Sequence, residues 1–330
     1  MQFVVERALI PDPSRIEAVR ASARPMLDPE LQAEPRRFFA FLDAPPHDVH
    51  LVRQVRRRRL DGGAAHDCRI QSDYVPYLVP ERPDELTPVH VELWHHESNA
   101  PRGTVVALHG FTMGRPRIDA ALLMAGQWYR RGLDVALVTL PYHGARTPPE
   151  ARFSGERFAS PDVSRLSEAV REAVYEIRQV IQWRREETGA PVGLLGLSLG
   201  GYLASLMGGL CEDLDFLIPM APPACIGDLA WGFLEHAQRH QDPTSLSYDE
   251  LRRAFRVHSP LAHPLRVPRE RVLIVGGRGD RIVPPHHPAA LWQHWERPKI
   301  HWFSGSHLAP FGRGRIVQAI LRHLEELAVL

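Results

Sequence analysis

The chain has 330 residues, of which 44% are hydrophobic and 24% charged, as expected for a globular protein with a sizeable core. Its 40 basic and 39 acidic side chains leave a formal net charge of +1, so no global field recruits nucleic acid or an anionic membrane. One local run, Arg56-Arg57-Arg58-Arg59, is basic, and we interpret it as a solvated face rather than a docking patch.

Cysteine usage predicts neither a disulfide framework nor a thiolate zinc site. Cys68, Cys211 and Cys225 are widely spaced and form no CxxC pair. We therefore expect free thiols in a reducing compartment and no metal site.

Nothing in the sequence predicts export or membrane insertion. The N-terminal MQFVVERALIPDPSR has acid, arginine and proline too early for a signal peptide. The uncharged stretch 192–210 is interrupted by glycines, so a strand, a tight turn and a buried helix explain it better than a membrane span. We expect a soluble, cytoplasmic protein, and the sequence leaves its oligomeric state open.

The first part of the chain differs from the rest. Residues 1–67 are rich in proline, arginine and short amphipathic pieces, and we expect a mostly helical extension packed on the core. Segments 74–79 and 89–96 alternate well enough to predict two strands joined by a proline-containing turn.

A regular alternation of buried strands and helices follows. Short apolar runs predict strands at 104–110, 134–140, 191–196, 216–221, 271–277 and 299–305. Helical spacing of apolar residues predicts helices at 118–132, 164–189, 199–210 and 315–330. Because parallel crossovers need a helix, this order predicts the α/β class: a mostly parallel sheet with helices on both faces.

Residues 222–266 interrupt this alternation with two predicted helices. We expect this insertion to form a helical cap over the carboxyl edge of the sheet, where α/β proteins bind ligands. The predicted organisation is thus an extension at 1–67, a core at 68–221 and 267–330, and a cap at 222–266. Trp231 and Phe233 suggest an apolar underside to the cap, although they would equally serve to pack the insertion onto the core.

The segment Gly196-Leu197-Ser198-Leu199-Gly200 matches the pattern G-x-S-x-G between an apolar strand and an apolar helix. The glycines let the chain turn sharply and hold the serine hydroxyl clear of the sheet. This context favours Ser198 as a nucleophile over a turn that needs glycine only for close packing.

A serine nucleophile needs a base that is held by a third group, and the two partners should follow as acid and then histidine. Asp280 comes just after the strand predicted at 271–277, in a glycine-containing turn. His307 comes just after the last predicted strand and is approached through small residues. We therefore predict Asp280 as the acid and His307 as the base.

Other candidates for these roles fit less well. Asp213 and Asp215 lie just after the elbow helix. His294 falls on a predicted helix, and His301 lies inside a strand.

Attack on an acyl carbonyl creates an oxyanion that needs preorganised donors. The expected donors are the backbone N–H groups of Leu199, directly after the nucleophile, and Phe111, in the loop after the strand at 104–108. Thr112 is the second choice in that loop, and it is also a candidate for the substrate pocket. His109 beside it is expected to be structural, with its ring hydrogen-bonded to nearby backbone.

The motifs HGF, PYHGAR, GLSLGG, GRGDRIVPP and SGSH occur in this order, and the chain resembles the serine esterase and peptidase branches of the α/β-hydrolase superfamily. The resemblance covers residues from about 73 to 330 apart from the insertion. It implies an eight-stranded, mostly parallel sheet, a serine–aspartate–histidine triad and no cofactor. In PYHGAR, His143 and Arg146 then either line the substrate pocket or brace a turn.

The leading hypothesis is hydrolysis of an ester or similar activated acyl compound, a small molecule, through an acyl-Ser198 intermediate. The same triad would serve an acyltransferase, if the cap excludes water, or a thioester or carbon–carbon hydrolase. A non-catalytic binding protein is a further alternative because fold does not fix function. The complete set of serine, acid, histidine and oxyanion loops argues against it.

Overall fold

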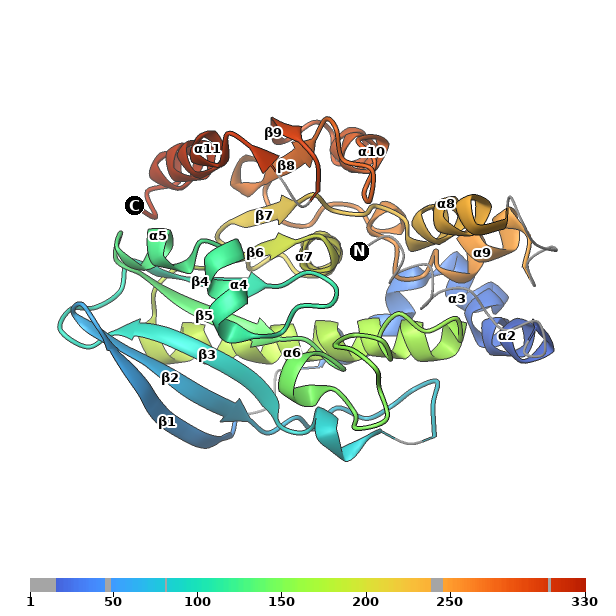
Figure 1. The fold of residues 1–330 in the computed structure, drawn as a ribbon, viewed down its shortest axis with the longest axis horizontal. Coiled ribbons are helices and arrows are strands. Elements are labelled where there is room, and N and C mark those ends of the chain that lie inside the picture. The colour runs from blue at the N-terminus through green and yellow to red at the C-terminus, as the bar shows by residue number, and fades with distance from the viewer. Residues whose placement is uncertain (1–15, 45–48, 81, 239–245, 308–309) are drawn as a thin grey trace.

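A ten-stranded sheet organises the described part of the chain, which in this computed structural model comprises residues 16–44, 49–80, 82–238, 246–307 and 310–330 (Figure 1). The strands are β1 (Leu51–Leu60), β2 (Gly63–Ile70), β3 (Val89–His96), β4 (Gly103–Leu108), β5 (Leu133–Thr139), β6 (Val192–Leu197), β7 (Leu217–Met220), β8 (Leu273–Gly277), β9 (Lys299–Gly305) and β10 (Pro310–Phe311). The order across the sheet is β1-β2-β3-β5-β4-β6-β7-β8-β9-β10. Neighbours from β5 to β9 are parallel, whereas β1, β2, β3 and β10 pair antiparallel.

The mostly parallel α/β architecture predicted from the sequence is confirmed, with two more strands than the resemblance implied. β1 extends one edge of the sheet, and the two-residue β10 folds back on β9 at the other edge.

Helices cover both faces of the sheet. The α-helices are α2 (Ile16–Ala23), α3 (Pro29–Ala33), α4 (Pro116–Leu122), α5 (Ala125–Tyr129), α6 (Val163–Thr188), α7 (Leu199–Leu210), α8 (Ile226–Gln238), α9 (Tyr248–Ala254), α10 (His286–His294) and α11 (Arg313–Glu326). In β4, Val106 and Leu108 join the core beneath α6 and α7, while Val105 and Ala107 join the core beneath α5 and α11. Burial on both faces explains why the central strands read as continuous apolar runs.

The helix expected at 164–189 is present as α6. Asp162 caps its N-terminus by accepting a hydrogen bond from Arg165 N at 3.0 Å. Gly189 ends it in the left-handed conformation, with φ of 63°. The single helix expected at 118–132 is instead divided into α4 and α5 at Met124, whose φ is 59°.

The strand expected at 74–79 is absent. Glu168 of α6 accepts hydrogen bonds from the backbone N–H groups of Tyr77 and Leu78 and from the Tyr74 hydroxyl. A buried side chain therefore satisfies polar groups that a neighbouring strand would otherwise pair, and the segment stays irregular.

The N-terminal extension is helical only in its first part. Residues 16–43 pack on α6, where Arg171 Nε donates to Phe38 O at 2.7 Å. The expectation of a mostly helical extension is wrong for residues 51–67, which belong to the hairpin of β1 and β2. Its turn, Asp61-Gly62, is a strong hairpin signal that the arginine run beside it obscured.

The arginine run lies on β1, whose interior residues are exposed at the edge of the sheet. Arg58 lies over the ring of Trp94, and Arg56 pairs with Glu97 at 2.9 Å. The long side chains thus lie along the hairpin and cover apolar surface while their charges stay in water.

The insertion forms α8 and α9. This helix pair lies beside α2 and α3, although the two pairs are far apart in the sequence (Figure 1). Gln32 Nε2 donates to Arg253 O at 2.8 Å across this contact. The N-terminal helices therefore support the insertion from the side. Within the described residues, no helix combines the length and apolar character needed to cross a membrane.

Candidate active site

Ser198 occupies a strained turn between β6 and α7. Its φ of 56° and ψ of −112° lie in a region that residues with side chains rarely adopt. A Cβ added to Gly196 would collide with Gly200 O, and one added to Gly200 would collide with Leu108 O. The two glycines are thus required by close backbone approach, which holds the serine at the end of β6.

His307 and Asp280 form a hydrogen-bonded pair. His307 Nδ1 lies 2.6 Å from Asp280 Oδ2, and Asp280 is only 3% exposed. The other carboxylate oxygen, Oδ1, accepts hydrogen bonds from the N–H groups of Ile282 and Val283, both at 2.9 Å. The acid is therefore fixed by backbone donors on one side and by the imidazole on the other.

A cavity of about 410 Å³ contains Ser198 and His307 in its lining, so the structure brings the elbow and the histidine loop together. Asp280 lies behind His307 and does not line it. Phe111 and Leu199, the expected oxyanion residues, also line this space.

Apart from Ser198, His307 and the exposed Arg313, the lining is dominated by apolar side chains. Leu166 and Val170 of α6 belong to it, and so do Ile282 and Val283 after β8. Leu166 and Val170 belong to the apolar spacing that predicts the helix at 164–189. Nothing in the spacing distinguished residues facing the cavity from residues facing the core.

The loop after β4 lies against the serine. A Cβ added to Gly110 would lie 3.5 Å from Ser198 Cβ, and Met113 N donates to Gly110 O at 3.2 Å to close a turn. Thr112, with φ of 67°, is in this turn but does not line the cavity. The loop therefore contributes Phe111 and Met113 to the cavity rather than the expected Thr112.

The cap faces the cavity with a different set of residues than expected. Ile226, Leu229 and Ala230 of α8 line it, with the i, i+3, i+4 spacing of one helical face. Trp231 is turned away from this face and packs on Tyr248, with ring centroids 5.5 Å apart. Trp231 as a pocket residue is therefore a wrong prediction, and the side chain of Phe233 lies outside the described residues.

His143 is fully buried and does not line the cavity. Its Nδ1 lies 2.8 Å from Pro141 O, and its ring packs on Phe111 with centroids 6.1 Å apart. Burial lowers the pKa of His143 well below its usual value, so the ring is neutral. The structure thus gives His143 the bracing role, behind a cavity residue.

His109 is likewise structural. Its Nε2 accepts a hydrogen bond from Leu140 N at 3.1 Å, so the ring proton is on Nδ1. Nδ1–H then donates to Gly110 O at 2.9 Å. Burial lowers its pKa to about 4. Both ring nitrogens are engaged with backbone, as the sequence analysis expected.

Arg146 is also buried away from the cavity. Its Nη1 and Nη2 donate to the two oxygens of Glu176 on α6, at 2.7 and 2.6 Å, and Nη1 donates to Thr139 O at 2.9 Å. Arg82 reaches the same carboxylate at 3.0 Å. Arg146 therefore ties the loop after β5 to α6, and it cannot contact a substrate in the cavity.

Arg146→Ala is expected to lower the free energy of unfolding by about 3–5 kcal/mol, because Glu176 would stay buried with its bidentate partner removed. Urea unfolding measures the change. Arg152→Ala is the matched control, because its ion pair with Glu156 lies on the surface and should contribute about 1 kcal/mol or less. Near-normal stability with a raised KM would instead make Arg146 a substrate contact.

A second serine–histidine contact lies in the core. Ser167 Oγ is 3.2 Å from His258 Nε2, and His258 Nδ1 contacts the Tyr202 hydroxyl. Ser167 and His258 are both fully buried, and burial lowers the pKa of His258 to about 3. The pair has no carboxylate among its hydrogen-bond partners in the described residues and no access to the cavity, so it links α6 to the segment after α9.

Comparison with known protein families gives two overlapping matches, which together span residues 42–319. The family described as alpha/beta hydrolase domain containing 18 matches residues 42–224, and the family described as serine hydrolase (FSH1) matches residues 158–319. The chain belongs to the alpha/beta hydrolase domain containing 18 family. It is an enzyme of the α/β-hydrolase superfamily, as its motifs had indicated.

An uncharacterized protein of Mycobacterium tuberculosis is 32% identical over 313 residues, which cover 90% of this chain and 71% of that protein. Solved structures share the fold at low identity. Acetyl xylan esterase from Paenibacillus sp. R4 has a TM-score of 0.66 at 15% identity, over 91% of this chain and 95% of that chain. Acetyl xylan esterase 1 from Thermoanaerobacterium sp. JW/SL YS485 has a TM-score of 0.62 at 15% identity, over 90% and 94%.

Proposed function

We propose that this α/β-hydrolase is a serine esterase that cleaves small-molecule esters through an acyl intermediate on Ser198. One observation carries the proposal. Ser198, in its strained turn, and His307, bound to the buried Asp280 at 2.6 Å, line the same cavity.

The hydrogen bond to Asp280 defines what His307 can do. The carboxylate accepts a hydrogen bond from Nδ1–H, which leaves the lone pair on Nε2. Nε2 takes the proton of Ser198 Oγ as that oxygen attacks the ester carbonyl, and then gives it to the leaving alcohol. In the second half of the reaction Nε2 activates a water molecule in the same way. The water attacks the acyl-Ser198 ester, and the carboxylic acid product is released.

The N–H groups of Phe111 and Leu199 are the proposed donors to the oxyanion. Leu199 begins α7, whose N-terminus carries partial positive charge, and Phe111 comes from the loop that lies against Ser198. Such donors stabilise the tetrahedral intermediate because they are already oriented before charge develops.

The lining of the cavity favours an apolar acyl group. Its volume of about 410 Å³ is in the range of small-ligand pockets, and leucine, valine, isoleucine and methionine side chains form most of its surface. Two of the similar structures are acetyl xylan esterases, which supports ester chemistry on this fold. The apolar lining supports acyl groups longer than acetyl.

Two measurements test the proposal together. The protein should react with a fluorophosphonate probe, and it should hydrolyse p-nitrophenyl esters with a preference that depends on acyl length. A Ser198→Ala control must lose both. If the folded wild-type protein neither takes up the probe nor hydrolyses any ester of the series, the chain is not a serine esterase.

The cap should select the acyl chain. Leu229→Ala and Ile226→Ala are each expected to flatten the rise of kcat/KM with acyl length, since each methylene buried in an apolar pocket contributes roughly 0.8 kcal/mol, or about fourfold. The shortest ester should be turned over almost normally. Trp231→Ala on the same helix is the matched control, because this ring packs on Tyr248 outside the cavity.

A uniform loss across all acyl lengths would contradict this role of the cap. It would mean that α8 supports the catalytic loops instead of contacting the substrate. If Trp231→Ala alone flattened the dependence of kcat/KM on acyl length, the wrong face of α8 would have been assigned to the substrate.

A further inference from the structure

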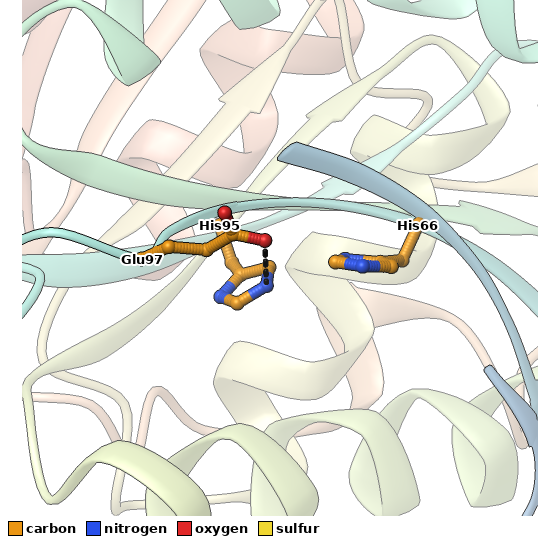
Figure 2. Close-up of side chains that lie close together, drawn as sticks. All are labelled: His66, His95 and Glu97. Atoms are coloured by element: carbon orange, nitrogen blue, oxygen red, sulfur yellow. Dashed lines mark ion pairs between the residues drawn. The ribbon is translucent and has the colours of Figure 1, made fainter. Parts of the chain in front are cut away.

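Three side chains with metal-binding chemistry gather on one face of the sheet where β2 pairs with β3: His66, His95 and Glu97 (Figure 2). Ala64 of β2 lies opposite His95 of β3, so His66, two residues on, is a diagonal neighbour on the same face. Glu97 follows two residues after His95. One possible ligand atom from each residue lies within 4.8 Å of the other two.

Other contacts leave these ligand atoms largely uncommitted. His66 Nδ1 is buried, with no hydrogen-bond partner among the described residues. His95 Nε2 lies 4.0 Å from Glu97 Oε1, which is too long for a hydrogen bond. Glu97 Oε2 is held by Arg56 at 2.9 Å, so the other oxygen is the one turned toward the imidazole.

The two imidazoles lie close together. The ring centroids of His66 and His95 are 4.9 Å apart. At this separation both rings can contribute a nitrogen to one ion, with the Glu97 carboxylate as a third ligand.

We propose that His66, His95 and Glu97 bind a divalent transition-metal ion, for which Zn²⁺ is the best fit. Two imidazole nitrogens and one carboxylate oxygen form a common three-ligand zinc set, with water in the fourth position. Zinc–nitrogen bonds of about 2.0–2.1 Å place tetrahedral ligand atoms about 3.4 Å apart. The present separations, up to 4.8 Å, would have to shorten by side-chain rotation, which the exposed position of Glu97 allows while Oε2 stays with Arg56.

Arg56 has two opposing effects on such a site. Its bond to Oε2 orients Glu97, as residues behind metal ligands commonly do. Its positive charge also repels the cation. The site is therefore suited to moderate affinity and to a transition metal held by nitrogen, more than to Mg²⁺ or Ca²⁺, which depend on several anionic oxygens.

The proposed site is remote from the catalytic serine. β3 is antiparallel to β5, and Trp94, next to His95, pairs with Val135 near the start of β5. Ser198 instead follows the carboxyl end of β6, and β6 runs parallel to β4 and β5, so the serine lies at the opposite end of these strands. The ion would thus link β2 to the end of β3 and stabilise the sheet edge, without taking part in ester cleavage.

Zinc titration of the full chain, freed of any histidine tag and pretreated with chelator, tests the proposal. Competition with a chromophoric chelator gives the stoichiometry and affinity, and thermal unfolding gives the stabilisation that binding to the folded state must produce. We expect one equivalent bound and a raised Tm. Co²⁺ in place of Zn²⁺ should give the visible absorption of a nitrogen- and oxygen-ligated ion.

Variants distinguish this site from other histidines. His66→Ala and His95→Ala should each weaken zinc binding at least tenfold and abolish the rise in Tm. His50→Ala, which removes an exposed histidine near the other end of the same hairpin, should change neither. His307→Ala should also bind one equivalent with unchanged affinity, which separates this site from the His307–Asp280 pair.

The proposal is overturned if zinc binds no more tightly to the wild type than to the His66→Ala, His95→Ala double variant. Equal weakening by His50→Ala, or binding that depends on His307 alone, would overturn it too. None of these outcomes depends on whether the protein hydrolyses esters.

Discussion

Ser198→Ala is expected to lower kcat/KM for a p-nitrophenyl ester by ~10³-fold or more, while the protein stays folded. The reason lies in the geometry of the elbow. Ser198 is at the cavity wall, in a strained turn with φ of 56° at the end of β6. Alanine removes only the hydroxyl oxygen, so the packing of the turn changes little.

Steady-state kinetics and a fluorophosphonate labelling assay measure this loss, with circular dichroism as the check on folding. Ser167→Ala is a useful comparison, because it removes the hydroxyl of the buried Ser167–His258 contact and should leave turnover per folded molecule nearly unchanged. If Ser167→Ala inactivated the enzyme and Ser198→Ala did not, the catalytic serine would have been misassigned.

His307→Ala should be about as damaging as Ser198→Ala, and Asp280→Asn somewhat less so, because the acid orients the imidazole without reacting. The carboxamide has a specific defect here. Its oxygen would stay with the N–H groups of Ile282 and Val283, which donate to Asp280 Oδ1, so its NH₂ would face His307 Nδ1. That arrangement favours the His307 tautomer with its proton on Nε2, which cannot accept the serine proton.

The kinetics of both variants, compared with His286→Ala, test the assignment. His286 is an exposed histidine at the start of α10, in the chain between the acid and the base. Its removal should leave kcat/KM nearly unchanged. Inactivation by His286→Ala together with a functional His307→Ala would show that another histidine is the base.

Several features were predictable from the sequence because they depend on residues close together along the chain. The period of apolar residues gave the strands and helices of the core, and Gly189 gave the end of α6. The elbow was recognisable because Gly196 and Gly200 are needed within two residues of Ser198. Asp280 and His307 could be placed at strand ends by local turn composition, and those strand ends do meet at one edge of the sheet.

Other features were decided only by the tertiary structure, because they depend on which distant segments pack together. Arg146 is polar and follows a strand, like a pocket residue, but Glu176 on α6 takes both ends of its guanidinium. The face of α8 that meets the cavity depends on how the cap docks, so Trp231 points elsewhere.

The strands β1, β2 and β3 at one side of the sheet were also decided by tertiary structure. The arginine run in β1 has no alternation of polar and apolar residues that would predict a strand. β1 forms because β2 offers a pairing partner after the Asp61-Gly62 turn. His66 and His95 are ordinary strand residues in the sequence. Only the register of β2 against β3 brings them to one face, since strand pairing joins positions that no local pattern connects.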